Sequence, residues 1–237
     1  MTGSRLRQRV LPRVAALFAA AAVAIARGGG PSGEEILKNV DARLEPVHDY
    51  TVTLDVVADI ERLNVPPMHA TMYFKQPDKI HVDAEGFALL PREGLQPAVG
   101  KLLSRFNVTE TGSDTLAGVP VRRVSLQAKS ERGFPRSLSL YVDPHRWTTE
   151  RIVTRGSADR VATITFSYVQ VEGVWLPAEM SAAFSLAPAD SLEGDLPAAP
   201  MRPQQMPRKG TVTVRFSGYR LNTGLKDDIF TKDPLTR

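Results

Sequence analysis

Apolar and polar side chains alternate strictly on both sides of a short turn near residue 77, and this alternation constrains the fold more than any other feature. Period two is typical of a β-strand with one buried face, and Gln76-Pro77-Asp78 is typical of a hairpin turn. The pattern predicts a hairpin in which the apolar residues of the two strands face each other as Phe74 with Ile80 and Met72 with Val82. The apolar positions are Met68, Ala70, Met72, Phe74, Ile80, Val82 and Ala84.

The same alternation recurs through most of the chain, which predicts an antiparallel sheet with one solvated face. A long strand is expected from Tyr50, and its apolar face consists of Val52, Leu54, Val56, Ala58 and Ile60. Further strands are expected at 106–111, 119–128, 138–142, 149–155, 161–169, 175–186 and 211–219, so that the sheet has about ten or eleven strands. Turns are expected at 112–114, 117–118 and 172–173, with a bulge at Arg122-Arg123 where the alternation slips.

Two helices are expected beside this sheet. Ser32 and Glu35 form a capping box at the start of an amphipathic helix over 33–44, which Pro46 ends. A second, short helix is expected over 97–105, with Pro97 at its first position. The apolar side of this short helix consists of Val99, Leu102 and Leu103.

An apolar segment, Phe87-Ala88-Leu89-Leu90, follows the hairpin and fits no strand alternation. Together with the short helix it predicts a movable cover, or lid, over residues 87–103. We therefore expect lipid or acyl chains to bind between the sheet and this lid. Periodicity alone favours a closed, filled core with no ligand, because apolar alternation primarily signals burial. The expected lipid-binding residues are Leu54, Val56, Met72, Phe74, Ile80, Val82, Phe87, Leu89, Leu90 and Leu102.

Residues 1–26 have the pattern of a secretory signal peptide: a segment with four arginines, then an alanine-rich apolar run that ends in Ala24-Ile25-Ala26. This segment contains 4 of the 30 lysine and arginine residues and none of the 26 aspartate and glutamate residues. Residues 27–237 therefore contain 26 of each and have no net charge, which gives no support to a nucleic-acid partner. They are expected to form a single domain, with a proline-rich mobile loop at 188–210.

Catalytic signatures are absent from the sequence, which has no cysteine, no G-x-S-x-G, no H-E-x-x-H and no phosphate-binding glycine loop. In the predicted hairpin, His81 lies opposite Tyr73 and not opposite His69, so the two histidines are poorly arranged for a metal, which needs three or four convergent ligands. We therefore expect no catalytic residues, no metal and no cofactor.

Several short motifs, in order along the chain, resemble the LolA-type periplasmic lipoprotein carriers and the related RseB-type regulators. The motifs are Ile36-Leu37-Lys38-Asn39-Val40-Asp41, Tyr73-Phe74-Lys75-Gln76-Pro77-Asp78-Lys79, Asp114-Thr115 with Gly118-Val119-Pro120, Leu140-Tyr141-Val142-Asp143-Pro144, Gly173-Val174-Trp175-Leu176-Pro177 and Asp228-Ile229-Phe230. The loop at 188–210 is not part of that pattern.

The resemblance implies an α+β, mainly β fold: an unclosed antiparallel half-barrel covered by N-terminal and lid helices, with a hydrophobic interior. It also implies a non-enzymatic carrier in the periplasm that sorts acylated cargo towards the outer membrane. The expected partners are acyl chains of lipid or lipoprotein and an inner- or outer-membrane protein. The alternative is an RseB-like sensor that binds a membrane-protein partner, and the third reading is an enzyme on the same scaffold.

Overall fold

A computed structural model describes residues 30–84, 99–130, 135–156, 161–185 and 209–231. Residues Pro31–Arg237 form a compact unit that is separate from Met1–Gly30. The predicted signal peptide, the apolar segment at 87–90 and almost all of the predicted loop at 188–210 lie outside the described residues.

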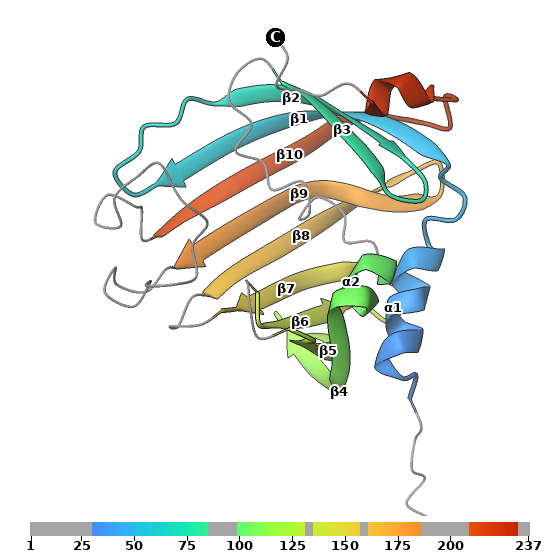
Figure 1. Cartoon of the computed structure of the whole chain (residues 1–237), viewed down its shortest axis with the longest axis vertical. Coiled ribbons are helices and arrows are strands. Elements are labelled where there is room, and N and C mark those ends of the chain that lie inside the picture. The colour runs from blue at the N-terminus through green and yellow to red at the C-terminus, as the bar shows by residue number, and fades with distance from the viewer. Residues whose placement is uncertain (1–29, 85–98, 131–134, 157–160, 186–208, 232–237) are drawn as a thin grey trace, which may run out of the picture. The chain divides into compact units, whose positions relative to one another are not determined.

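The described part of the chain is mostly strand (Figure 1). The helices are α1 (Gly33–Ala42), α2 (Val99–Arg105) and the 3-10 helix η4 (Asp227–Phe230). The strands are β1 (Asp49–Ile60), β2 (Met68–Lys75), β3 (Lys79–Ala84), β4 (Phe106–Leu116), β5 (Val119–Ala128), β6 (Ser137–Val142), β7 (Thr149–Arg155), β8 (Val161–Val171), β9 (Val174–Ser185) and β10 (Lys209–Leu221).

All ten strands belong to one antiparallel sheet with the order β3-β2-β1-β10-β9-β8-β7-β6-β5-β4. No ladder within the described ranges pairs the edge strands β3 and β4, so the sheet stays open. The predicted mainly-β, unclosed half-barrel is therefore confirmed. The predicted hairpin register is confirmed as well, because Phe74 pairs with Ile80, Met72 with Val82 and Tyr73 with His81.

Helix α1 begins as predicted from its capping box. The Ser32 Oγ accepts a hydrogen bond from the Glu35 backbone N–H at 3.2 Å, and the Glu35 carboxylate accepts one from the Ser32 N–H at 2.7 Å. The helix ends at Ala42, two residues before the predicted end, and Arg43 is its C-cap. Its apolar side, with Ile36 and Leu37 fully buried, packs on the half of the sheet that contains β4 to β7.

The core consists of two clusters on the same sheet. One lies over β1, β2, β9 and β10 and includes Leu54, Met72 and Val214. The other lies between α1 and β4–β7 and includes Val124 and Leu140. Ile164 and Phe166 of β8 pack against both clusters and connect them.

Two local predictions were wrong. Residues 112–114, expected as a turn, continue strand β4, where Gly112 pairs with Arg123. The Arg123 guanidinium lies 2.7 Å from the Glu110 carboxylate and 3.8 Å from that of Asp114, so ion pairs support the longer ladder. The bulge expected at Arg122-Arg123 is absent from both ladders of β5, and the register shift lies in β4, between Val108 and Glu110.

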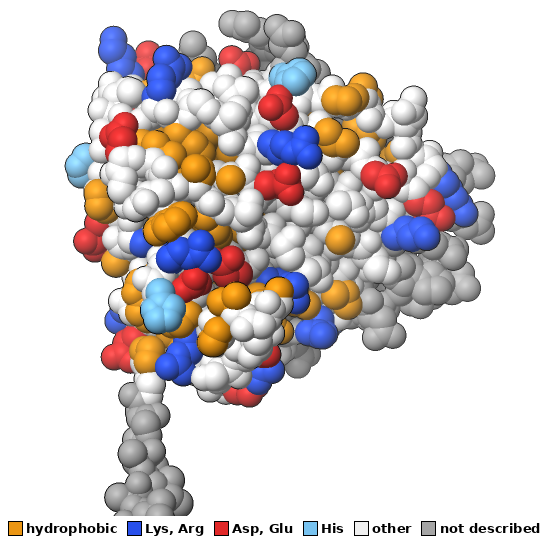
Figure 2. Space-filling view, turned by 180° about the vertical axis from the view of Figure 1, so that it is seen from behind, with side chains coloured by type: hydrophobic (Ala, Val, Ile, Leu, Met, Phe, Trp, Pro, Cys, Tyr) orange, Lys and Arg blue, Asp and Glu red, His pale blue; other side chains and the backbone are white. Residues whose placement is uncertain are grey.

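Acidic and basic side chains are interspersed over the face seen in Figure 2. Large apolar side chains that are exposed in the described part of the chain are Val57, Leu63, Val119 and Val169. They come from different elements, and isolated exposed apolar residues of this kind are normal on protein surfaces.

Candidate functional site

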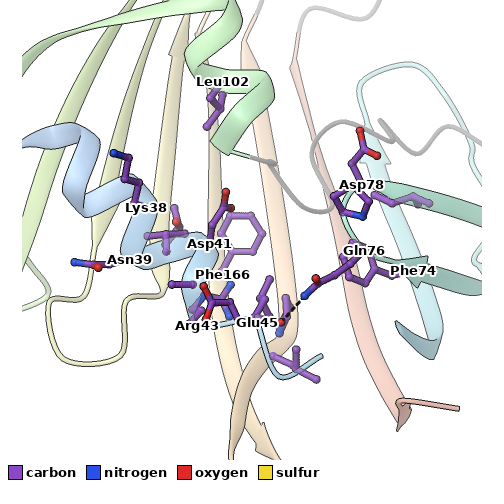
Figure 3. Close-up of a pocket in the computed structure, with 18 of the residues that line it drawn as sticks. Lys38, Asn39, Asp41, Arg43, Glu45, Phe74, Gln76, Asp78, Leu102 and Phe166 are labelled. Atoms are coloured by element: carbon purple, nitrogen blue, oxygen red, sulfur yellow. Dashed lines mark hydrogen bonds between the residues drawn. The ribbon is translucent and has the colours of Figure 1, made fainter. Parts of the chain in front are cut away.

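A cavity of about 760 Å³ lies between α1, α2, the β2–β3 hairpin and the sheet. This volume is within the range of about 300–1,000 Å³ that is typical of small-molecule sites. In Figure 3, Asp41, Arg43 and Glu45 line one side of the cavity, and Phe74, Gln76 and Asp78 of the hairpin line the other. Leu102 of α2 and Phe166 of β8 complete the labelled wall.

The cavity wall is largely apolar and aromatic, as a site for a hydrocarbon chain requires. The apolar and aromatic residues that line it are Val40, Ala42, Leu44, Tyr50, Phe74, Pro77, Ile80, Leu102, Phe106, Phe166, Tyr168, Leu176 and Pro177. Tyr50 stacks on Phe74 with ring centroids 4.9 Å apart, so these two rings form one continuous aromatic surface.

An irregularity in β10 brings another aromatic ring to this end of the sheet. The β1–β10 register shifts between Thr51 and Thr53, and Gly218 in the shifted stretch has a φ of 64°, which favours glycine. The shift brings Tyr219 against Tyr50, with ring centroids 5.5 Å apart. A regular alternation from Phe216 would have turned Tyr219 to the other face.

Arg43 is the notable polar residue of the cavity wall. Its Nη1 donates a hydrogen bond to the Trp175 carbonyl at 2.6 Å, and its guanidinium lies over the Tyr168 ring at 5.6 Å from the centroid. The Arg43 Nε is buried and has no hydrogen-bond partner among the described residues. Burial lowers the pKa of this guanidinium, although the nearby Tyr168 and Tyr50 act in the opposite direction.

Three tyrosines around Arg43 have raised pKa values. Burial is the largest cause of the raised pKa of Tyr50, Tyr168 and Tyr219, since a phenolate loses its hydration in the interior. All three are therefore neutral near pH 7 and supply no negative charge to Arg43. The hydroxyls of Tyr168 and Tyr219 donate to the carbonyls of Thr149 and Pro177, each at 2.8 Å.

Thr149, at the start of β7, is a second polar residue of the wall. Only 4% of its surface is exposed, and its Oγ1 has no hydrogen-bond partner in the described structure. Buried polar atoms in proteins are almost always hydrogen-bonded. Two residues of the cavity wall therefore each have a buried polar atom without a partner, the Arg43 Nε and the Thr149 Oγ1.

A hydrogen-bonded connection holds the hairpin beside the end of α1. The Gln76 amide nitrogen donates to the Leu44 and Val47 carbonyls, both at 2.9 Å, and the Gln76 N–H donates to the His48 carbonyl at 2.9 Å. Gln76 thus satisfies carbonyls that follow the helix and fixes the width of the cavity at this side (Figure 3).

The predicted lipid-binding residues fall into three groups. Phe74, Ile80 and Leu102 line the cavity. Four others, Leu54, Val56, Met72 and Val82, are at most 7% exposed and belong to the core cluster over β1 and β2, outside the cavity lining. The remaining three, Phe87, Leu89 and Leu90, lie outside the described residues. Lipid contact stays a prediction for all ten.

Sequence reasoning missed Arg43, Thr149, Phe166, Tyr168 and Tyr219. Arg43 had a usable signal, because it follows Val40 by three residues and so shares the apolar face of the helix. Thr149 looked like any polar strand residue. Its position in the cavity depends on the sheet's curvature, which no local pattern in the sequence encodes.

No group of three or more histidine, aspartate or glutamate side chains among the described residues could hold a metal ion. His69 contacts Asp55 on the polar face of the sheet at 2.5 Å, while the His81 ring lies 6.0 Å from that of Tyr73. None of the helices in the described ranges has the length and apolar character needed to cross a membrane.

Solved structures provide the comparison for this architecture. A protein domain from Vibrio parahaemolyticus named for outer membrane lipoprotein sorting matches with a TM-score of 0.60 and 12% identity, covering 84% of this chain and 96% of that one. A LolA superfamily protein from Nitrosomonas europaea matches with a TM-score of 0.51 and 13% identity, covering 87% and 100%. The chain has the LolA-like fold.

A DUF1329 family protein from Desulfovibrio piger also matches, with a TM-score of 0.58 and 13% identity, covering 84% of this chain and 95% of that one. No protein-family model matches the sequence, and no curated protein sequence matches it significantly. At identities this low the likeness extends to the fold alone.

Proposed function

We propose that the protein is a periplasmic carrier that binds the acyl chains of lipids or lipoproteins in its cavity and sorts them towards the outer membrane. The observation that carries this proposal is the cavity of about 760 Å³, whose wall is built from aliphatic and aromatic side chains of the sheet and both helices. Because protein interiors are close-packed, a space of this size beside the core is available to a ligand.

The energetics of such a site need no catalytic group. Each methylene group that moves from water into an apolar site contributes about 0.8 kcal/mol, so one long acyl chain supplies most of the affinity for carriage. Release then depends on a partner that offers the chain a better site, or on a change of the cavity wall. An inner- or outer-membrane protein would fill this role of donor or acceptor.

Two further observations support the cellular setting. The fold is shared with a domain that is named for outer membrane lipoprotein sorting. The first 26 residues have the sequence pattern of a secretory signal, which would direct the chain out of the cytoplasm.

Native mass spectrometry of the purified protein tests the proposal directly. We expect a population with a bound amphiphile, and reloading of the delipidated protein with a long-chain acyl probe in a one-to-one complex. Ile80→Asp and Leu102→Asp, which introduce charge at partly buried cavity positions, should reduce probe binding at least about tenfold, since several methylene groups would lose their apolar contacts.

Val57→Asp is the matched control, because Val57 is 49% exposed on the polar face of β1 and should leave probe binding unchanged. A wild-type protein that takes up no acyl probe would exclude the carrier function. If the wild-type protein took up no acyl probe but formed a stable complex with a membrane protein, the RseB-like sensor function would replace the carrier function.

A further inference from the structure

Arg43 and Thr149 contact the same tyrosine of the cavity wall. The Arg43 guanidinium lies over the Tyr168 ring at 5.6 Å, and the Tyr168 hydroxyl donates to the Thr149 carbonyl at 2.8 Å. Tyr168 therefore connects the two residues, and all three line the cavity. Arg43 at the ring of Tyr168 and Thr149 at its hydroxyl together form one polar region of the cavity wall.

The charge balance in this polar region favours an anion. The charge of Asp41 acts on Arg43 and raises its pKa, but burial acts more strongly and lowers it, and the three tyrosine neighbours of Arg43 are neutral. The cavity's own acids, Asp41, Glu45 and Asp78, are exposed to solvent. Desolvation therefore outweighs the nearby negative charge at Arg43, and a ligand that supplies a further negative charge there would reduce this cost.

We infer that the cavity selects amphiphiles whose polar end is an anionic oxygen group, a carboxylate or a phosphate, which accepts hydrogen bonds from the Arg43 guanidinium and the Thr149 hydroxyl. The hydrocarbon chain then lies along Phe166, Leu176 and Phe74. This inference rests on the proposed function, since it assumes that the cavity binds an acyl chain, and it adds the class of headgroup. Charge-assisted hydrogen bonds of this kind give both affinity and orientation.

The test compares three ligands of equal chain length: dodecanoate, dodecyl phosphate and neutral dodecanol. Their dissociation constants are measured on the delipidated full chain by displacement of a fluorescent acyl probe. We expect Arg43→Gln and Thr149→Val each to weaken binding of at least one anion about tenfold or more, because a hydrogen bond to a charged group is worth roughly one to two factors of ten. Dodecanol binding should change less than threefold.

Two controls separate binding from folding. Thr149→Val preserves the shape of the side chain and removes an unsatisfied hydroxyl, so the melting temperature of the ligand-free protein should be unchanged or higher. Arg220→Gln removes an exposed arginine of β10 that does not line the cavity, and it should leave anion binding unchanged.

The pattern of the three ligands decides between the outcomes. If the variants lose affinity for only one of the two anions, the inference is supported. A loss for dodecanoate indicates a fatty-acid-like headgroup, and a loss for dodecyl phosphate indicates a phospholipid-like headgroup. If the two variants lose affinity equally for the anions and for dodecanol, or if neither variant loses affinity, the inference is overturned but the carrier function is left intact. A wild-type protein that binds none of the three overturns both.

Discussion

At the scale of single residues, Gly33 shows how closely α1 packs on the sheet. It is buried at the start of the helix, and a Cβ built there would lie 2.6 Å from both the Thr111 Oγ1 and the Val108 Cγ1. Alanine normally stabilises a helix relative to glycine. Here the close contact should reverse that preference, because Thr111 and Val108 are β-branched and have few χ1 rotamers to move to.

We therefore expect Gly33→Ala to lower the free energy of unfolding by about 1–3 kcal/mol, as overpacking of a core does. Urea denaturation followed by circular dichroism measures this change. Gly112→Ala is the matched control, since its Cβ would meet only an Arg123 nitrogen, at 3.8 Å, and its effect should be close to zero. Equal effects of the two variants would contradict the packing argument.

At the scale of elements, one buried carboxylate fastens the turn after β10 to the start of β1. Asp49 accepts hydrogen bonds from the backbone N–H groups of Thr223, Gly224 and Leu225 at 2.8, 3.0 and 3.2 Å, and from the Thr223 hydroxyl at 3.2 Å. Burial alone would raise the pKa of Asp49, but these hydrogen bonds outweigh it and the pKa is lowered.

Asp49→Asn should destabilise the protein by about 2–3 kcal/mol, because an amide oxygen cannot accept all these bonds and its NH₂ group would face backbone donors. Chemical denaturation at neutral pH gives the value. Asp59→Asn, an exposed change on the same strand, should shift the unfolding midpoint little. A neutral effect of Asp49→Asn would show that the turn is held by other contacts.

Helix η4 is attached to β2 and β3 by a second carboxylate. Asp227 lies 2.7 Å from the Lys75 Nζ and 2.9 Å from the Lys79 Nζ, and Lys75 also donates to the Leu225 carbonyl at 2.7 Å. Hydrogen bonds from Lys75 and Lys79 lower the pKa of Asp227 from 3.8 to about 2. In Figure 1, η4 accordingly lies beside the hairpin.

This lowered pKa gives a pH prediction with a definite sign. A carboxyl group whose pKa is lower in the folded state stabilises the fold fully above its unfolded pKa, and loses this contribution as the pH falls through the folded value. The stability difference between wild type and Asp227→Asn should therefore be constant above about pH 5 and shrink between pH 3.8 and about 2. A difference that grew towards low pH would contradict the assignment.

At the scale of the whole molecule, the last strand holds the sheet together. β10 pairs with β1 on one side and with β9 on the other, and the described sheet has no other connection between β1–β3 and β4–β9. Strands β1–β3 therefore cannot join the rest of the sheet until the C-terminal strand β10 is present. Such pairing between distant segments is expected to fold slowly.

A fragment that ends at residue 208 should lack a cooperative unfolding transition, because it loses the ladders on both sides of β10 together with the buried Val214 and Phe216. Thermal unfolding by circular dichroism and limited proteolysis would show this. A fragment that ends at residue 226 lacks only η4 and the tail, and it should keep a sharp transition at a lower temperature. A cooperative transition in the shorter fragment would show that β4–β9 fold alone.

Much of this fold could be predicted because its signals are local. The hairpin register follows from the alternation around Gln76-Pro77-Asp78, and the start of α1 follows from Ser32 and Glu35. The errors occurred where tertiary contacts override local composition. Gly112-Ser113-Asp114 has turn residues, yet ladder pairing and the Arg123 ion pairs keep it in a strand.

The sequence alone determined that this chain forms an antiparallel sheet with one buried face and a helix that precedes the first strand. The period-two alternation and the capping box can be recognised because each depends on residues that are close together in the sequence. Only the tertiary structure decided which apolar residues fill the core and which line a cavity. Met72 and Phe74 have the same pattern in the sequence, but only Phe74 lines the cavity. The curvature of ten paired strands sets that difference, and it also brings Arg43 and Thr149, more than a hundred residues apart in the sequence, to the same tyrosine.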